Sequence, residues 1–227
     1  MAAKISGRRG ILNQPGMGNR IAWQVAMKLS GRFLGADHRD QYSGNHGYSL
    51  MAADKIEILS DGPWEAVLRI DGALVAPGGE RLARFSQKIT VGRLNRVIDV
   101  ELTFKPDVLP QDAPWDEYYG VRFAWNDNLA ELRPACHGFF WETTRDFFQA
   151  PDALDIRSEE ELGVTILSGG LPFYQRSGAR TLDAVLVPHG EGERVFRFGI
   201  GIDLADPLAE AARYLAPQPI LLENVAF

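Results

Sequence analysis

Aromatic and acidic side chains follow one another closely between Pro114 and Trp125, in the order Pro-Trp-Asp-Glu-Tyr-Tyr-Gly-Val-Arg-Phe-Ala-Trp. Aromatic rings can stack on the apolar C–H face of a sugar, and glycoside cleavage commonly uses two carboxylates about 5 to 10 Å apart. Asp116 and Glu117 are adjacent, however, and neighbours in an extended segment point to opposite sides. A turn whose carboxylates accept hydrogen bonds from backbone N–H groups is therefore favoured over a catalytic pair. The sugar-binding candidates of this segment are Trp115, Asp116, Tyr118 and Arg122.

A second aromatic cluster lies between Cys136 and Arg145, in the order Cys-His-Gly-Phe-Phe-Trp-Glu-Thr-Thr-Arg. His137 and Glu142 could form the kind of acid/base pair that a sugar mutarotase uses. Packing at a sheet edge, with the histidine hydrogen-bonded, is the favoured alternative. Cys136 is not predicted to be a nucleophile, because no third group that would orient a histidine beside it is evident. The sugar-binding candidates of this segment are His137 and Trp141.

Histidine and aspartate also occur in His38-Arg-Asp40, and His46 follows soon after. Nitrogen and oxygen ligands of these types can bind zinc. A catalytic metal site needs rigid supporting elements, whereas residues 29–47 are rich in Gly, Asp, His and Asn without a sustained period. We therefore predict an exposed polar loop over about 29–47 and no metal site in this chain.

Strand patterns dominate the segments that must position these residues. Over 97–105, for example, apolar and polar residues alternate with the two-residue period of a half-buried strand. One helix is predicted over about 207–215, because Asp206 is a natural N-cap and Pro207 fits the first helical position. Further strands are predicted over 21–27, 55–59, 64–70, 81–91, 119–125, 163–167, 182–187 and 195–202. Roughly ten strands without alternating helices predict an all-β fold, an antiparallel sandwich or curved double sheet, in a single domain over 1–227.

Composition and charge exclude several classes of function. The 227 residues carry a net charge of -6, so no nucleic-acid partner is expected, because a phosphate-binding surface needs clustered Lys and Arg. No run approaches the roughly 18 apolar residues typical of a membrane span, and the N-terminus lacks the apolar core of a signal peptide. The single cysteine rules out an internal disulfide, and a cytoplasmic setting is therefore predicted.

Several segments, taken in their order along the chain, resemble one protein family. They are Gly18-Asn-Arg-Ile-Ala-Trp-Gln-Val-Ala26, Met51-Ala-Ala-Asp-Lys-Ile-Glu57, the 114–125 segment above, Phe148-Gln-Ala-Pro-Asp152, Thr165-Ile-Leu-Ser-Gly-Gly-Leu-Pro172 and Phe196-Arg-Phe-Gly-Ile-Gly-Ile-Asp203. Together they resemble the C-terminal β-sandwich region of glycoside hydrolase family 38, the α-mannosidases, over about residues 4–224. The resemblance implies a β-supersandwich related to galactose mutarotase-like domains, consistent with the strand pattern.

The same resemblance implies that the catalytic residues of the family are absent from this chain. In the family, the zinc ligands and the catalytic nucleophile belong mainly to an N-terminal α/β barrel, followed by a helical bundle, and neither pattern is visible in this sequence. The family's zinc-binding His-x-Asp follows an apolar strand, whereas His38-Arg-Asp40 follows a Gly-rich loop, so that role is not carried over. Catalytic residues and cofactors are therefore not expected in this chain, and zinc is expected only in the absent barrel. Relatives usually continue past the segment resembling 219–225, so the chain is expected to be a truncated piece, a split gene product or a free-standing remnant.

Three functions stay open at this point. The first is a non-catalytic module that supports or completes a carbohydrate site of an α-mannosidase-like enzyme, with a separate catalytic barrel as its partner. The second is a free-standing carbohydrate-binding module that stacks sugar on Trp115, Tyr118, Trp141 or Tyr174. The third is a mutarotase-like epimerase that relies on His137 and a carboxylate. Self-association through sheet edges that an incomplete sandwich leaves exposed is a further expectation.

Overall fold

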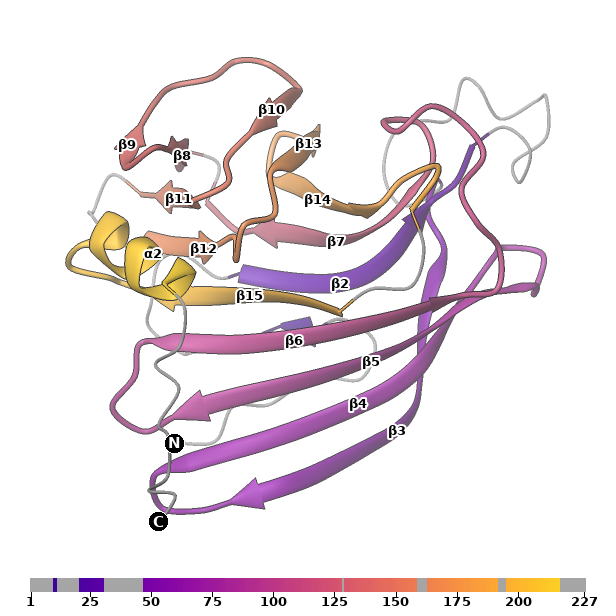
Figure 1. Ribbon diagram of the computed structural model, residues 1–227, viewed down its shortest axis with the longest axis horizontal. Helices are drawn as coiled ribbons and strands as arrows, with labels where there is room; N and C mark the ends of the chain where they lie inside the picture. Colours follow the sequence, from indigo (N-terminus) through magenta and orange to yellow (C-terminus); the bar gives the residue numbers. More distant parts are fainter. Residues whose placement is uncertain are drawn as a thin grey trace, which may run out of the picture.

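Long antiparallel strands make up most of the computed structural model, which describes residues 10–11, 21–30, 47–127, 129–158, 163–191 and 195–216. Within these residues the strands form two sheets that face each other (Figure 1). The larger sheet has the order β3 (Leu50–Asp61), β4 (Glu65–Val75), β5 (Arg81–Gly92), β6 (Val97–Pro106), β15 (Val195–Ile202), β12 (Gly163–Leu167), β11 (Ala153–Arg157), β8 (Glu131–Cys136), β9 (Phe139–Phe140). The smaller sheet has the order β1 (Gly10–Ile11), β2 (Ile21–Lys28), β7 (Tyr118–Trp125), β14 (Thr181–Val187), β13 (Phe173–Gly178), β10 (Phe147–Gln149). The predicted all-β antiparallel sandwich is confirmed.

The apolar core lies between the two sheets, because alternate residues of each strand point inward. Phe198 of β15 meets Phe123 of β7 edge-on, with ring centroids 5.6 Å apart. Phe104 of β6 and Tyr119 of β7 form a second pair across the core, also at 5.6 Å. All four rings are buried, and burying a large apolar side chain contributes about 1.5–3 kcal/mol. These contacts join the two sheets into one packed unit.

The helix in the described part of the chain, α2 (Pro207–Leu215), begins as predicted, because Asp206 Oδ1 accepts a hydrogen bond of 3.0 Å from a backbone N–H of the first turn. The helix packs on the outer face of the larger sheet, where the Tyr214 hydroxyl donates to Asp99 at 2.6 Å. A Cβ atom at residue 199 would lie 3.1 Å from the Tyr214 ring, so Gly199 permits the close approach. No described helix has the length and apolarity needed to cross a membrane.

Most strand predictions agree with the structure. The strands predicted over 163–167 and 195–202 coincide with β12 and β15, and the other predicted strands overlap observed ones. β8, β11 and β13 were not predicted, nor were β1, β9 and β10, which are only two or three residues long. Pro134 lies inside β8 and Asp155 inside β11, and both residue types count against a strand when the sequence is read alone.

The predicted polar loop at 29–47 lies largely outside the described residues, which omit 31–46. Its two ends are described and meet each other. The Leu29 N–H donates to the Gly47 carbonyl at 2.8 Å, and the Ser49 N–H donates to the Met27 carbonyl at 2.9 Å. The ends of this segment are therefore anchored beside β2.

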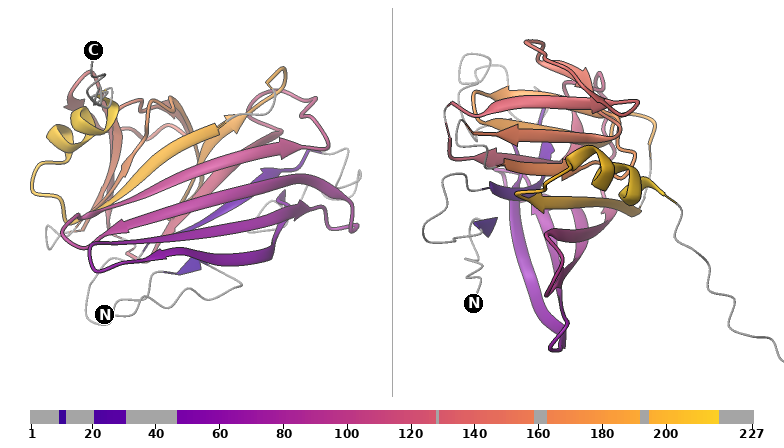
Figure 2. Two further views of the ribbon diagram at one scale, coloured as in Figure 1. Left: turned by 60° about the horizontal axis from the view of Figure 1, so that its bottom comes forward. Right: turned by 90° about the vertical axis from the view of Figure 1, so that its left-hand side faces the viewer.

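The larger sheet extends beyond the smaller one. Figure 1 shows β3 and β4 below the region where the two sheets face each other, and the right-hand view of Figure 2 shows these strands projecting from the two-layer part. Every residue of β3 is exposed or half-exposed, whereas β4 is partly buried. Among the described residues, no second layer therefore lies over this end of the larger sheet.

Candidate functional site

A groove of about 430 Å³ lies beside β10, the edge strand of the smaller sheet. Its walls come from the turn before β7, from the segment that runs from the end of β8 to β10, and from the start of β13. We call it the aromatic groove. The residues that line it are Trp115, Cys136, Trp141, Arg145, Phe147, Phe148, Gln149 and Phe173.

Strand alternation explains why aromatic rings reach this groove. Phe148 of β10 and Tyr174 of β13 are cross-strand partners that point into the core, where both are buried. Their neighbours Phe147 and Phe173 point the opposite way, and their side chains are 45% and 42% exposed. Two large rings therefore face solvent at the edge of the smaller sheet.

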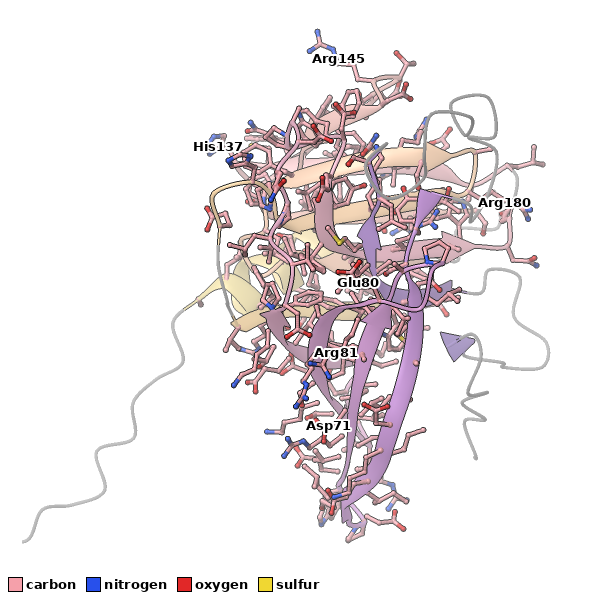
Figure 3. All side chains as sticks on the ribbon, turned by 90° about the vertical axis from the view of Figure 1, so that its right-hand side faces the viewer. Asp71, Glu80, Arg81, His137, Arg145 and Arg180 are labelled. Atoms are coloured by element: carbon pink, nitrogen blue, oxygen red, sulfur yellow. The ribbon has the colours of Figure 1, made fainter. Side chains whose placement is uncertain are left out.

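The rings of the aromatic groove contact one another. The Trp115 ring centroid lies 4.8 Å from that of Phe147 and 6.0 Å from that of Phe173. Trp141, on another part of the wall, meets Phe148 edge-on at 6.3 Å. Arg145 adds a charged donor at the rim, and Figure 3 shows its side chain directed towards solvent. Apolar rings with a few polar groups suit a ligand that has apolar faces and polar edges.

A buried polar cluster centred on Asp183 of β14 lies near the aromatic groove. The Asp183 side chain is fully buried. Its carboxylate accepts hydrogen bonds from the hydroxyls of Tyr48 at 2.5 Å and Tyr118 at 2.7 Å. It also accepts from Arg122 Nε at 3.1 Å and Ser177 Oγ at 3.2 Å. We call this group, together with Lys28 and Gln175, the Asp183 cluster.

The strand registers explain how the Asp183 cluster is assembled. Asp183 lies directly opposite Arg122 of β7 on one side and Gln175 of β13 on the other. Tyr118 of β7 lies opposite Lys28 of β2. Cross-strand partners point to the same face of a sheet. Since the facing side chains of β7 and β14 fill the core, these polar ones lie on the outer face of the smaller sheet.

Burial and nearby charges shift the pKa values of three members of the Asp183 cluster, Tyr48, Tyr118 and Lys28. Burial first, and then the Asp183 carboxylate, raise the pKa of Tyr48 and of Tyr118, so both hydroxyls keep their protons and donate. The Arg122 guanidinium lies 3.5 Å from the centroid of the Tyr48 ring, a cation–π arrangement. Burial lowers the pKa of Lys28, although the nearby carboxylates of Asp183 and Asp116 oppose that shift.

Lys28 joins the Asp183 cluster to the aromatic groove. Its Nζ donates to the backbone carbonyl of Trp115 at 2.6 Å and to Gln175 Oε1 at 3.0 Å. The same Gln175 oxygen accepts a hydrogen bond from the Tyr118 hydroxyl at 3.0 Å. Because the Trp115 ring forms part of the groove wall, the cluster fixes the turn that carries this ring.

The structure places the sequence candidates of the 114–125 segment in different surroundings. Trp115 lines the aromatic groove together with Trp141 of the second cluster. Tyr118 and Arg122 are buried in the Asp183 cluster, so neither offers a free surface to a ligand. Asp116 is exposed on the turn. The two tryptophans are thus the candidates that the fold brings together.

The carboxylates of Asp116 and Glu117 do not share one site. Glu117 is fully buried and accepts a hydrogen bond from Ser30 Oγ at 2.9 Å, while Asp116 is exposed. The expectation that adjacent carboxylates would not face one bond agrees with this arrangement. Tyr174, considered as a sugar-stacking surface, is fully buried, and that interpretation was wrong because alternation along β13 turns its ring into the core.

His137 lies in the turn between β8 and β9 and is exposed. Its backbone φ is 55°, in the left-handed region, and Gly138 follows with φ 77°. No hydrogen bond or ion pair among the described residues joins His137 to Glu142. In Figure 3, His137 and Arg145 lie well apart. The candidate acid/base pair therefore has no contact that would support it in this structure.

Sequence reasoning missed Asp183, Phe147 and Phe173. Asp183 interrupts the otherwise apolar stretch of β14, and a carboxylate inside an apolar strand signals a buried group that must be paired. Phe147 carries no such signal, because two consecutive phenylalanines do not reveal which of them faces the core. Phe173 follows Pro172 and resembles a loop residue when the sequence is read alone.

Among the residues that the structure describes, no group of three or more His, Cys, Asp or Glu is placed to hold a metal ion. The zinc candidates weighed above, His38, Asp40 and His46, lie outside the described residues. The prediction for these three residues therefore stays a prediction.

No protein-family model matches this chain, and no curated protein matches it. Solved structures do match. An α-mannosidase from Enterococcus faecalis V583 superposes on 88% of this chain with a TM-score of 0.60 and 12% sequence identity, and the match covers 28% of that chain. A protein in glycosyl hydrolase family 38 from Enterococcus faecalis superposes on 67% of this chain with a TM-score of 0.52 and 12% identity, covering 23% of that chain.

This chain therefore spans about a quarter of the length of the solved structures that it matches. Similarity at 12% identity establishes a shared fold, and function must be argued from the site. The resemblance seen in the sequence is confirmed at the level of the fold: this chain has the β-sandwich fold of one part of the family 38 α-mannosidases.

Proposed function

We propose that this chain is a non-catalytic β-sandwich module of an α-mannosidase-like glycoside hydrolase, and that its aromatic groove contributes to a carbohydrate site. The single observation that carries the proposal is the set of solvent-facing rings of Trp115, Trp141, Phe147 and Phe173 around one groove. A pyranose ring has apolar C–H faces and hydroxyl edges, which match such rings and the polar side chains of Arg145 and Gln149.

The proposed partner of the module is a separate catalytic barrel, which carries the zinc and the catalytic nucleophile. The proposal is supported by the share of the two solved structures that this fold covers, 28% and 23%, since most of each of those chains has no counterpart in this one. A cytoplasmic setting stays a prediction from the single cysteine.

A free-standing carbohydrate-binding module is the second candidate. One observation favours it: the ring of Trp115 contacts the rings of Phe147 and Phe173 directly, so a stacking surface is already assembled from these three residues. The preference of the groove among different glycans distinguishes these two candidate functions. A module of an α-mannosidase-like enzyme should prefer α-linked oligomannosides, whereas a free-standing module would bind unrelated glycans such as β-glucans at least as well.

Calorimetric titration of the isolated chain with α-linked oligomannosides tests the proposal. Trp115→Ala should weaken binding about tenfold, because a lost stacking contact of about 1.4 kcal/mol corresponds to that factor. Trp64→Ala is the matched control, since Trp64 is 68% exposed on the turn between β3 and β4, outside the groove. Absence of binding by the wild type, or equal loss in both variants, would refute the carbohydrate role. Hydrolysis of an aryl α-mannoside by the purified chain with zinc would refute the non-catalytic assignment.

A further inference from the structure

β3 gives the larger sheet a long open edge. The strand is 12 residues long, and its one neighbour in the described sheet is β4. The unpaired N–H and C=O groups of an edge strand can form a ladder with another strand, which is the basis of association by strand addition. The edge is also far from the aromatic groove, since Figure 1 shows β3 and β10 at opposite sides of the molecule.

Two isoleucines of β3 point in the same direction as the core residues and yet remain outside the core. Ile56 lies opposite Ile70 of β4, and Ile58 lies opposite Leu68. Cross-strand partners point to the same face, and Ile70 is buried in the core. Ile56 and Ile58 are nevertheless 55% and 68% exposed, because none of the described strands of the smaller sheet lies over this end of the larger sheet.

The other face of β3 carries charges of alternating sign. Lys55 lies opposite Asp71 of β4, and Glu57 lies opposite Arg69. Figure 3 shows Asp71 on this part of the long strands. Register irregularities on each side leave residues 55–58 as a regular stretch of β3. A strand that continued this pattern on the open side would need an acid opposite Lys55 and a base opposite Glu57.

We propose that β3 pairs with β3 of a second copy of this chain, antiparallel, about a twofold axis at Ile56. In this register the two Ile56 side chains lie opposite each other, and Lys55 of each copy lies opposite Glu57 of the other. The pairing is isologous, as expected of a twofold dimer. It extends the alternating charges of β3 and β4 across the new interface and brings the exposed Ile56 side chains of the two copies side by side.

Neighbouring registers of the β3–β3 pairing place less favourable side chains opposite each other. An axis at Glu57 places the two Glu57 carboxylates opposite each other, and like charges in that position are destabilising. An axis between Ile56 and Glu57 places Ile56 of each copy opposite Glu57 of the other, and Lys55 of each copy opposite Ile58 of the other. Within one chain Lys55 and Glu57 form an exposed ion pair at 2.8 Å. Exposed pairs of this kind contribute little, so both side chains are free to exchange partners.

Light scattering over a concentration series tests the proposal, with an expected limiting mass of twice 25.2 kDa for the wild type. Lys55→Glu and Glu57→Lys each place like charges opposite one another twice, so the dissociation constant of each variant should rise at least about tenfold. Mixing the two variants restores both opposite-charge contacts, and they should form a heterodimer. The double variant carrying both changes should dimerise with itself.

Circular dichroism and denaturant unfolding of each variant confirm that the chain is folded, since both side chains are exposed. A wild type that stays monomeric at every concentration would overturn the proposal and leave the exposed face to a different protein. A dimer that survives both single changes would overturn it as well. Single variants that remain monomeric when mixed would show that the two strands do not meet in this register.

Discussion

Replacing Asp183 with asparagine should be among the most damaging conservative changes in this protein. The change keeps the size of the side chain and removes its charge. It removes the carboxylate that pairs with the buried Arg122 guanidinium at 3.1 Å, a side chain that is only 9% exposed. It also presents an amide N–H₂ group to the hydroxyls of Tyr48 and Tyr118, which now donate to Asp183.

The magnitude follows from these contacts. Removing one partner of a buried ion pair costs about 3–5 kcal/mol. A domain of this size has about 5–15 kcal/mol of stability in total. At about 2–4 °C per kcal/mol for a domain of 150–250 residues, Asp183→Asn should lower the melting temperature by roughly 6–20 °C. The loss should be unaffected by moderate salt, because a buried pair is screened little.

Denaturant unfolding followed by circular dichroism measures this effect. Asp112→Asn is the matched control, since Asp112 is exposed and surface changes usually alter the free energy of unfolding by less than about 0.5 kcal/mol. A loss below about 1 kcal/mol for Asp183→Asn would refute the reasoning. It would mean that the Asp183 cluster does not stabilise the outer face of the smaller sheet.

Three further predictions concern pH, the helix and the groove. Because the folded pKa values of Tyr48 and Tyr118 are raised above 10.0, their contribution to stability is complete below pH 10 and is lost as the pH rises through the folded values. An alkaline titration of tyrosinate absorbance should show one fewer late-ionising group in Tyr48→Phe; an unchanged titration curve would contradict this. Asp206→Ala should cost about 1 kcal/mol in denaturant unfolding by removing the N-cap of α2, and Asp206→Asn should recover most of it; no loss in the alanine variant would count against the cap. Alkylation of the half-exposed Cys136 with a bulky maleimide should block oligomannoside binding to the groove, whereas Cys136→Ser treated in the same way should still bind.

The fold can be predicted from the sequence wherever one face of a strand is exposed to solvent and the other is buried. Alternation over 97–105 marks β6 clearly, and the pair Asp206 and Pro207 marks the start of α2. The alternation of apolar and polar residues does not reveal a strand that is short or that contains residue types uncommon in strands. Pro134 in β8 and the buried Asp155 in β11 hide their strands in this way.

The candidate site could be predicted only in part, because its residues come from strands that are neighbours in the sheet but distant in the sequence. Lys28, Arg122 and Asp183 come from β2, β7 and β14, which are neighbours in the smaller sheet and far apart in the sequence. The two-residue period shows that the Arg122 side chain points away from the core. It does not show which strand lies beside β7. Trp115 and Trp141 could be named from residue type, but the groove that joins them depends on where β10 and β13 pair.

The hydrogen bond from Lys28 to the carbonyl of Trp115 has a consequence for affinity. Ordering a loop on binding consumes free energy that would otherwise appear as tighter association. Here the turn that carries the Trp115 ring is already held by Lys28, which is itself held by Gln175. A ligand that stacks on this ring would therefore meet a preorganised surface. The affinity for such a ligand would therefore depend on the Lys28 amine, although Lys28 does not line the groove.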